Sequence, residues 1–282
     1  MTALVGCDFS SSPSARKPIV LAWGECVGAV VRLHRLEYLP SLALFSDWLH
    51  KPGPWLGGFD LPFGLPRELV ETLGWPTQWE ACIGHYAALS RETIREQFAA
   101  FCAARPVGSK FAHRATDRPA GSSPSMKWVN PPVAFMLHAG VPRLLEAGIC
   151  VAGLHPGNPL QVDALGKPLH VALEAYPGLL AREILGRQSY KSDDKAKQTT
   201  ERLIARKDVV TALELGHTRL GLRLKMTHAQ RDALVADASG DALDATLCLL
   251  QVAWAQQQPV GATQFGLPTD MDPLEGWIVS AE

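Results

Sequence analysis

The stretches A-L-V-G-C-D at residues 3–8 and P-W-L-G-G-F-D at residues 54–60 decide the fold that the sequence predicts. Each is an apolar run with the length of a buried strand, and each ends in a carboxylate, Asp8 in the first and Asp60 in the second. Ligand sites of open α/β sheets lie at the carboxyl ends of their strands. We therefore expect Asp8 and Asp60 to end adjacent parallel strands and to face a shared site.

The rest of the chain alternates predicted strands with predicted helices, which is typical of an α/β protein. Further strands are expected at 17–23 and 27–36, joined by a turn at 24–26, and at 148–153 and 169–175. Helices are expected at 42–49, 77–104, from Pro131 or Pro132 to Gly148 with an interruption at Pro142, 177–186, 195–215, and from Ser239 or Gly240 to about Gln257. Residues 105–132 are rich in Pro, Gly and Ser and are expected to form a long functional or mobile loop.

The last predicted helix carries two acids, Asp241 and Asp244, in the sequence G-D-A-L-D-A. Residues three apart lie about 60° apart around a helix, and this face is otherwise apolar. The chain has no Lys or Arg after Arg231, so no basic residue of the helix neutralises the pair. Such a cluster needs a proton, a basic partner from elsewhere, or a metal, and oxygen ligands suit Mg²⁺ or Mn²⁺.

Each acid also has an explanation that involves no ligand. Asp8 and Asp60 are residues that commonly form turns, and Asp241 in a first turn favours the helix dipole. Glu174, which ends the strand predicted at 169–175, is able to pair with a nearby Arg. The recurrence of acids at the ends of several elements nevertheless favours a common site.

Composition is that of an ordinary folded protein: 282 residues, 27 Lys and Arg against 28 Asp and Glu, and a net charge of −1. This near-zero charge makes no global case for nucleic acid, but the charge is segregated. Residues 105–130 carry +4 and residues 186–225 carry +5, whereas residues 226–282 carry −7. A basic middle and an acidic end suit an anionic ligand beside a cation-binding site.

Localisation is expected to be cytoplasmic, without membrane association. No apolar run approaches the roughly 18 residues of a membrane-spanning helix, and the N-terminal residues do not form a secretory signal. The six cysteines are scattered without a C-x-x-C pair, which favours reduced thiols over disulfides or a zinc site.

Six motifs resemble a known family in their order along almost the whole chain. They are G-C-D-F-S, F-D-L-P-F-G-L-P, H-R-A-T-D, E-A-Y-P, G-D-A-L-D-A and E-G-W-I. The pattern resembles the ribonuclease H-like superfamily and, more narrowly, the prokaryotic domain-of-unknown-function family 429, described as predicted RNase H-like nucleases. The resemblance implies one α/β domain over residues 1–282 with a mixed five-stranded sheet flanked by helices. It also implies a helical and loop insertion at 75–148, after the fourth strand.

The resemblance further implies a set of site residues. Asp8, Asp60, Asp241 and Asp244 would bind Mg²⁺ or Mn²⁺, and Glu174 would join them or hold a basic residue. Lys110, His113, Arg114 and Lys191 would bind the phosphate groups of the substrate. Ribonuclease H enzymes proper place a catalytic Glu on the helix after the third strand, where this chain has only Asp47, so a resolvase-like arrangement fits better.

The leading functional hypothesis is a divalent-metal-dependent nuclease that hydrolyses DNA or RNA with two metal ions. Two alternatives stay open. D-F-S-S-S resembles the first phosphate loop of actin-like ATPases, which favours a nucleotide-dependent kinase or ATPase, although the chain has no second Gly-rich loop. The third possibility is a nucleic-acid-binding module without catalysis.

Overall fold

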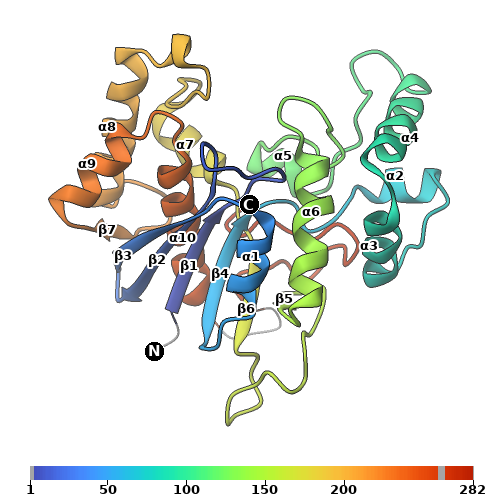
Figure 1. The fold of residues 1–282 in the computed structure, drawn as a ribbon, viewed down its shortest axis with the longest axis horizontal. Helices are drawn as coiled ribbons and strands as arrows, with labels where there is room; N and C mark the ends of the chain where they lie inside the picture. Colours follow the sequence, from blue (N-terminus) through green and yellow to red (C-terminus); the bar gives the residue numbers. More distant parts are fainter. Residues whose placement is uncertain (1–2, 260–263, 282) are drawn as a thin grey trace.

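The computed structural model describes residues 3–259 and 264–281, and it is an α/β structure built on one mixed sheet of seven strands (Figure 1). The strands are β1 (Ala3–Asp8), β2 (Ile19–Val27), β3 (Val30–Leu39), β4 (Trp55–Asp60), β5 (Cys150–Val151), β6 (His170–Glu174) and β7 (Arg223–Lys225). Their order across the sheet is β5-β6-β4-β1-β2-β3-β7.

Strand β1 lies at the centre of the sheet and sets the position of the acids. It pairs antiparallel with β2 and parallel with β4, and the parallel register places Asp8 directly beside Asp60. Strand β6 runs parallel to β4 on the other side and places Glu174 beside Phe59. The prediction that Asp8 and Asp60 end adjacent parallel strands is therefore confirmed.

The expected count of five strands is wrong, because two short strands extend the two edges of the sheet. Strand β5 adds two residues beside β6, and β7 adds three residues beside Val30–Arg32 of β3. The sequence of β7, Arg-Leu-Lys, has a single apolar residue between two charged ones, which is too short for a strand pattern. Strand β7 forms because it pairs with the free edge of β3.

The first hairpin turns later than the expected residues 24–26. Strands β2 and β3 are joined by Gly28 and Ala29, and Gly28 has a φ of +56°, a conformation that glycine adopts without strain. Gly24 instead lies within β2 at a bulge, where an added Cβ would stand 2.5 Å from the Arg32 carbonyl oxygen. Gly24 is therefore required by the close packing of β2 against β3, and it does not form the turn.

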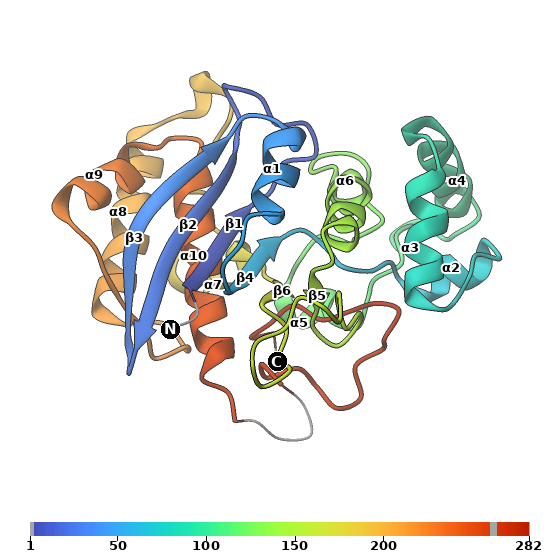
Figure 2. The same ribbon diagram turned by 60° about the horizontal axis from the view of Figure 1, so that its bottom comes forward.

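Helices cover both faces of the sheet (Figure 2). They are α1 (Leu42–Leu49), α2 (Arg67–Thr72), α3 (Trp79–Ala88), α4 (Arg91–Ala103), α5 (Asp117–Ala120), α6 (Val133–Glu146), α7 (Pro177–Leu185), the 3₁₀ helix η1 (Lys195–Lys197), α8 (Thr200–Leu215), α9 (His228–Ala236) and α10 (Asp241–Gln256). Side chains of α1, α3, α4 and α6 share one apolar core with Val5 and Cys7, whereas α7 to α10 share another with Leu4. Successive side chains of β1 point to opposite faces of the sheet and therefore pack into the two different cores.

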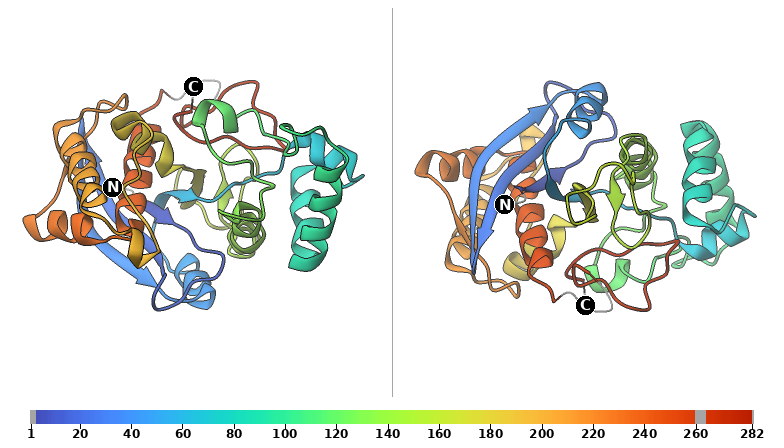
Figure 3. Two further views of the ribbon diagram at one scale, coloured as in Figure 1. Left: turned by 90° about the horizontal axis from the view of Figure 1, so that it is seen from above. Right: turned by 90° about the horizontal axis from the view of Figure 1, so that it is seen from below.

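The chain between β4 and β5 forms α2 to α6, and α2, α3 and α4 stand at one end of the molecule, far from α8 and α9 at the other (Figure 3). The single helix expected at 77–104 is two helices, and Ser90 caps the second by accepting a hydrogen bond from Thr93 N–H at 3.0 Å. Residues 195–215 are likewise divided into η1 and α8.

The expected interruption at Pro142 does not occur, since α6 is continuous around it. Its neighbours Val141 and Leu144 are fully buried, so tertiary packing holds the helix despite the missing N–H. The Arg143 side chain also donates to the Ala139 carbonyl at 2.5 Å.

All six cysteines are free thiols, as expected. Among the described residues, the helices lack the combination of length and apolar character that a membrane crossing requires.

Candidate metal centre

Three carboxylates from three elements converge at the carboxyl end of the central strands. Asp8 ends β1, Asp60 ends β4 and Asp244 lies in the first turns of α10, and one oxygen from each lies within 4.8 Å of those of the other two. Asp244 is fully buried, Asp8 is 8% exposed, and Asp60 is partly exposed. The structure thus brings together the strand-end acids and one acid of α10.

Two glycines let α10 approach the sheet closely enough to deliver Asp244. A Cβ added to Gly6 of β1 would stand 2.0 Å from the Ala245 carbonyl oxygen and 2.3 Å from the Leu249 nitrogen. A Cβ added to Gly58 of β4 would stand 2.4 Å from Val252. Helix α10 therefore packs directly on the backbone of the two strands that carry Asp8 and Asp60.

The start of α10 is fixed by a residue outside the helix. Gly240 is the N-cap residue, with a φ of +79°, and the Asp237 side chain accepts the Ala242 N–H at 2.9 Å. Asp237 thereby supplies the cap that Gly240 lacks. The cap leaves Asp241 and Asp244 free for other contacts.

Basic partners for the α10 acids come from distant parts of the chain. Lys191 Nζ contacts one oxygen of Asp244, and the Tyr190 hydroxyl donates to the other. Lys17 Nζ lies 3.8 Å from Asp241 and 2.5 Å from Asp193. Burial lowers the pKa of Lys191, but the Asp244 carboxylate overcomes this effect and holds that pKa well above its usual value.

Asp8 and Asp60, in contrast, form no ion pair within the described part of the chain. Burial, followed by repulsion from Asp244, raises the pKa of Asp8 well above its usual value and that of Asp60 to about 7. Burial likewise raises the pKa of Asp241, against the attraction of Lys17. Two adjacent carboxylates that resist ionisation are a pair that a bound cation would stabilise.

The donor set fits a hard divalent ion. Octahedral Mg²⁺ binds oxygens at about 2.1 Å, so oxygens of one ion lie about 3–4 Å apart. The oxygens of the three acids all lie within 4.8 Å of one another, which is compatible with that spacing. Two nearby thiols do not compete, because burial raises the pKa of Cys7 and of Cys248 well above the usual value and keeps both protonated. An all-oxygen set favours Mg²⁺ or Mn²⁺ over zinc.

Glu174 holds a basic residue instead of joining the cluster. The Arg114 side chain is 2% exposed, and it contacts Glu174 Oε1 at 2.6 Å and Asp117 Oδ1 at 2.9 Å. All five guanidinium N–H groups of Arg114 are used, on Glu174, Asp117 and the Glu275 carbonyl. Arg114 therefore has no donor left for the expected phosphate contact, and its role in the structure is internal.

A cleft of about 660 Å³ opens above the carboxylates, and we call it the strand-end cleft. It is lined by Asp8, Asp60, Asp241 and Lys191, by Ser10 and Ser11 after β1, by residues 130–133 at the start of α6, and by residues 175–178 at the start of α7. Asp244 is fully buried and does not line the cleft. Two of the expected phosphate-binding residues line the cleft, Lys191 and Arg114. The Lys191 side chain is 39% exposed, whereas Arg114 is buried and all its donors are already used.

Lys110 and His113, the other two expected phosphate-binding residues, do not line the strand-end cleft. His113 lines a separate pocket of about 440 Å³ together with Arg105 and Arg118, and Lys110 is exposed at the surface beside it. The structure therefore does not place Lys110 or His113 at the carboxylates.

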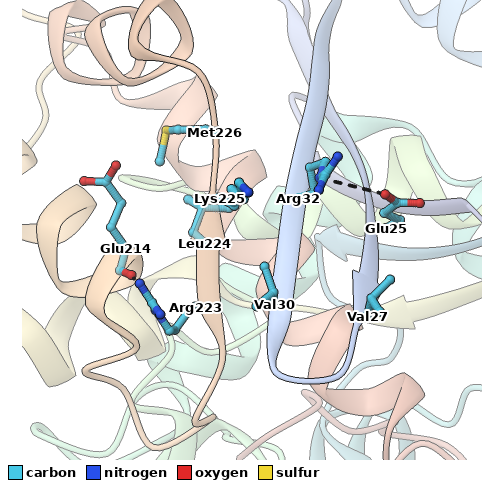
Figure 4. A pocket seen from close by; sticks show the side chains of 9 residues that line it. All are labelled: Glu25, Val27, Val30, Arg32, Glu214, Arg223, Leu224, Lys225 and Met226. Atoms are coloured by element: carbon cyan, nitrogen blue, oxygen red, sulfur yellow. Dashed lines mark hydrogen bonds and ion pairs between the residues drawn. The ribbon is translucent and has the colours of Figure 1, made fainter.

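A further cleft, of about 600 Å³, lies between the β2–β3 hairpin and residues 214–226 (Figure 4). Its two acids, Glu25 and Glu214, lie on different sides and are paired, Glu25 with Arg32 at 4.0 Å and Glu214 with Arg231 at 3.1 Å. This cleft has no convergent carboxylates and is not the candidate metal centre.

Sequence reasoning missed several contacts of the centre. Lys17 and Tyr190 meet the α10 acids from remote segments, Asp193 pairs with Lys17, and Tyr176 lines the cleft. The only available signals were S-Y-K at 189–191 and E-A-Y-P at 174–177, in which a tyrosine adjoins a residue already singled out.

Comparison of the chain with protein-family models, with curated proteins and with solved structures gave no match.

Proposed function

We propose that the protein is a divalent-metal-dependent phosphodiesterase that hydrolyses nucleic acid. The observation that carries the proposal is the convergence of Asp8, Asp60 and Asp244, of which the first two have no ion-pair partner among the described residues. The order of elements supports the further proposal of a ribonuclease H-like fold with residues 75–148 as an insertion. Three antiparallel strands open the chain, a helix follows, and a fourth strand ends in an acid.

Each residue of the centre has a separate part in this proposal. Asp8 and Asp60 would bind the metal from the ends of β1 and β4, while Tyr190 and Lys191 orient Asp244 by contacting its two oxygens. Bound divalent ions supply an activated water and stabilise charge on the leaving oxygen. Asp8 and Asp244 are buried, so their carboxylates lie in a part of the site that is shielded from water. Electrostatic interactions are strong in such an environment.

The test is a cleavage assay on labelled DNA and RNA with Mg²⁺ or Mn²⁺. We expect wild type to cleave, EDTA to abolish cleavage, and Asp8→Asn to lower the rate at least about 100-fold. Asp47→Asn is the matched control, because Asp47 is exposed on α1 and does not line the cleft. Wild type that cleaves nothing with either metal, or an Asp8→Asn variant that keeps full activity, would contradict the proposal.

A nucleotide-dependent enzyme is the second candidate, and one observation favours it. Ser10 and Ser11, two and three residues after Asp8, line the strand-end cleft at the position expected for a phosphate loop. The same preparations should therefore be tested for metal-dependent turnover of ATP and GTP. Nucleotide turnover without cleavage of any nucleic acid would favour this candidate over the nuclease.

A further inference from the structure

The strand-end cleft has little free positive charge for a nucleic-acid backbone. Its four basic side chains are all engaged: Lys17 with Asp193, Lys191 with Asp244, Arg114 with Glu174, and Arg182 with the carbonyl oxygens of Gly121 and Ala120. The acids that line it outnumber these bases. A long polyanion is therefore not attracted along the cleft, and a ligand must gain affinity from other contacts.

The cleft is instead apolar on one side. Pro131, Pro132, Val133 and Met136, all at the start of α6, line it, and the two prolines are exposed. Helix α6 belongs to the apolar core on one face of the sheet, and α7 belongs to the core on the other face. The start of α7 therefore faces the start of α6 across the strand ends.

Tyr176 stands on the α7 side of this space. It lies two residues after the end of β6, is partly exposed and lines the cleft. Burial raises the pKa of its phenol, against the opposing effect of the Arg182 guanidinium.

The Tyr176 ring is held in place by its surroundings. The Arg182 guanidinium carbon lies 5.3 Å from the ring centroid, and Arg182 Nη2 donates to the Tyr176 hydroxyl at 2.9 Å. A Cβ at Gly178 would stand 2.6 Å from the ring, so glycine leaves the room that the ring occupies. The Tyr176 backbone N–H donates to Gln251 of α10 at 3.0 Å. The ring is a fixed aromatic surface beside the metal centre.

Given the proposed nuclease activity, on which this inference rests, we propose that the cleft takes one unpaired nucleobase between Tyr176 and the apolar start of α6. The substrate is then single-stranded nucleic acid. The volume of about 660 Å³ is that of a small-ligand site and suits one flipped-out or terminal nucleotide. Asp8 and Asp60 line the same space, and a single strand places an unpaired base there without the unpairing that a duplex requires. Base–aromatic stacking supplies affinity without basic residues.

The experiment compares kcat/KM on a single-stranded oligonucleotide, on the same strand with one abasic sugar moved along it, and on the strand in a perfect duplex. For wild type we expect the single strand to be cleaved at least about tenfold faster than the duplex. One abasic position should lower the rate about 5–150-fold, the range that corresponds to the loss of one base stack. The salt dependence should be shallow, with a log–log slope no steeper than about −1.4, equivalent to two phosphate contacts.

Variants assign the effect to the ring. Tyr176→Leu should slow cleavage of the intact strand about 5–150-fold and remove the sensitivity to the abasic sugar, whereas Tyr176→Phe, which keeps an aromatic ring, should retain that sensitivity. Tyr38→Leu is the matched control, since Tyr38 is 53% exposed on β3 and outside the cleft. If Tyr176→Leu does not fold, Met136→Ala tests the opposite side of the same slot and should weaken the abasic effect.

The outcomes separate this inference from the proposed function. If wild type cleaves nucleic acid but accepts duplex as well as single strand, or if Tyr176→Leu keeps the abasic effect, the inference is wrong and the nuclease proposal stands. If wild type cleaves no nucleic acid, the proposed function fails and takes this inference with it.

Discussion

The acids of the centre differ in what balances their charge. Asp244 and Asp241 contact Lys191 and Lys17, whereas Asp8 and Asp60 stand side by side with no basic partner in the described ranges. Burying an ionised carboxylate without a partner costs several kcal/mol, so such a pair persists where function requires it. The unpaired acids are accordingly the ones that most need a cation.

The raised pKa of Asp60 gives a pH dependence. Its folded-state value of about 7 lies above the usual 3.8, so the folded protein binds the extra proton and loses stability as pH rises from about 4 to 7. Metal binding displaces that proton, so metal affinity should increase over the same range.

We therefore expect Mg²⁺ to raise the melting temperature more at pH 8 than at pH 6, measured by thermal unfolding with and without metal. Asp60→Asn should flatten both the metal-free pH dependence and the metal effect. A metal-induced shift that is equal at the two pH values in wild type would contradict the assignment.

Arg114 is expected to act on stability and not on substrate binding. Arg114→Ala leaves Asp117 and Glu174 buried without their partner, which should lower the free energy of unfolding by about 3–5 kcal/mol in denaturant titrations. Lys110→Ala, a nearby exposed basic residue, should change it by less than about 0.5 kcal/mol. Unchanged stability in Arg114→Ala, with a raised KM, would return Arg114 to the role of phosphate ligand.

At the level of elements, the contact of α10 with β1 and β4 creates the centre, and it depends on the absence of side chains at Gly6 and Gly58. The carbonyl of Ala245 occupies the place of a Cβ at position 6. Because Asp244 adjoins Ala245, any outward movement of the helix removes Asp244 from the strand-end acids.

Gly6→Ala should therefore lower the free energy of unfolding by about 3 kcal/mol or more, roughly a 10 °C loss in Tm, and should weaken metal binding in the molecules that fold. Calorimetry with and without Mg²⁺ measures both. Gly84→Ala is the control, since a Cβ at that position in α3 meets nothing within 4 Å. It should be neutral or stabilise by up to about 1 kcal/mol. A neutral Gly6→Ala would show that the helix contact is loose.

Strong periodic patterns made most elements predictable, and short or long-range features were not. The helix at 42–49 and the strands ending at Asp8 and Asp60 agree with the pattern because apolar spacing alone determines them. Strand β7 was missed since three residues carry no period, and α9 was missed although Thr227 and Gln230 form a capping box. The partners Lys17 and Lys191 were beyond the reach of local reasoning, because only the folded chain brings them to α10.

At the scale of the whole molecule, the C-terminal segment ties the helices between β4 and β5 to the sheet. Glu275 accepts the Arg67 N–H of α2 and the Ala115 N–H, both at 2.8 Å, and the Val279 N–H donates to the Glu174 carbonyl at 2.9 Å. The C-terminal segment thus joins α2 and the backbone next to Arg114 to the end of β6.

Glu275→Ala should lower the free energy of unfolding by about 2–4 kcal/mol, because it leaves two backbone N–H groups without a charged acceptor. Glu71→Ala, which removes an exposed carboxylate that pairs with the same Arg67, should cost less than about 1 kcal/mol. Chemical denaturation of the two variants compares them directly. Equal, small losses would show that the C-terminal segment contributes little to the fold.

The most direct test of the central claim is anomalous diffraction from crystals soaked in Mn²⁺. The account predicts an anomalous peak bound by Asp8 and Asp60 on the side of Asp244, with the peak lost in Asp8→Asn. Well-ordered crystals with the cleft open to solvent and no manganese at these carboxylates, or with the peak unchanged in Asp8→Asn, would contradict it.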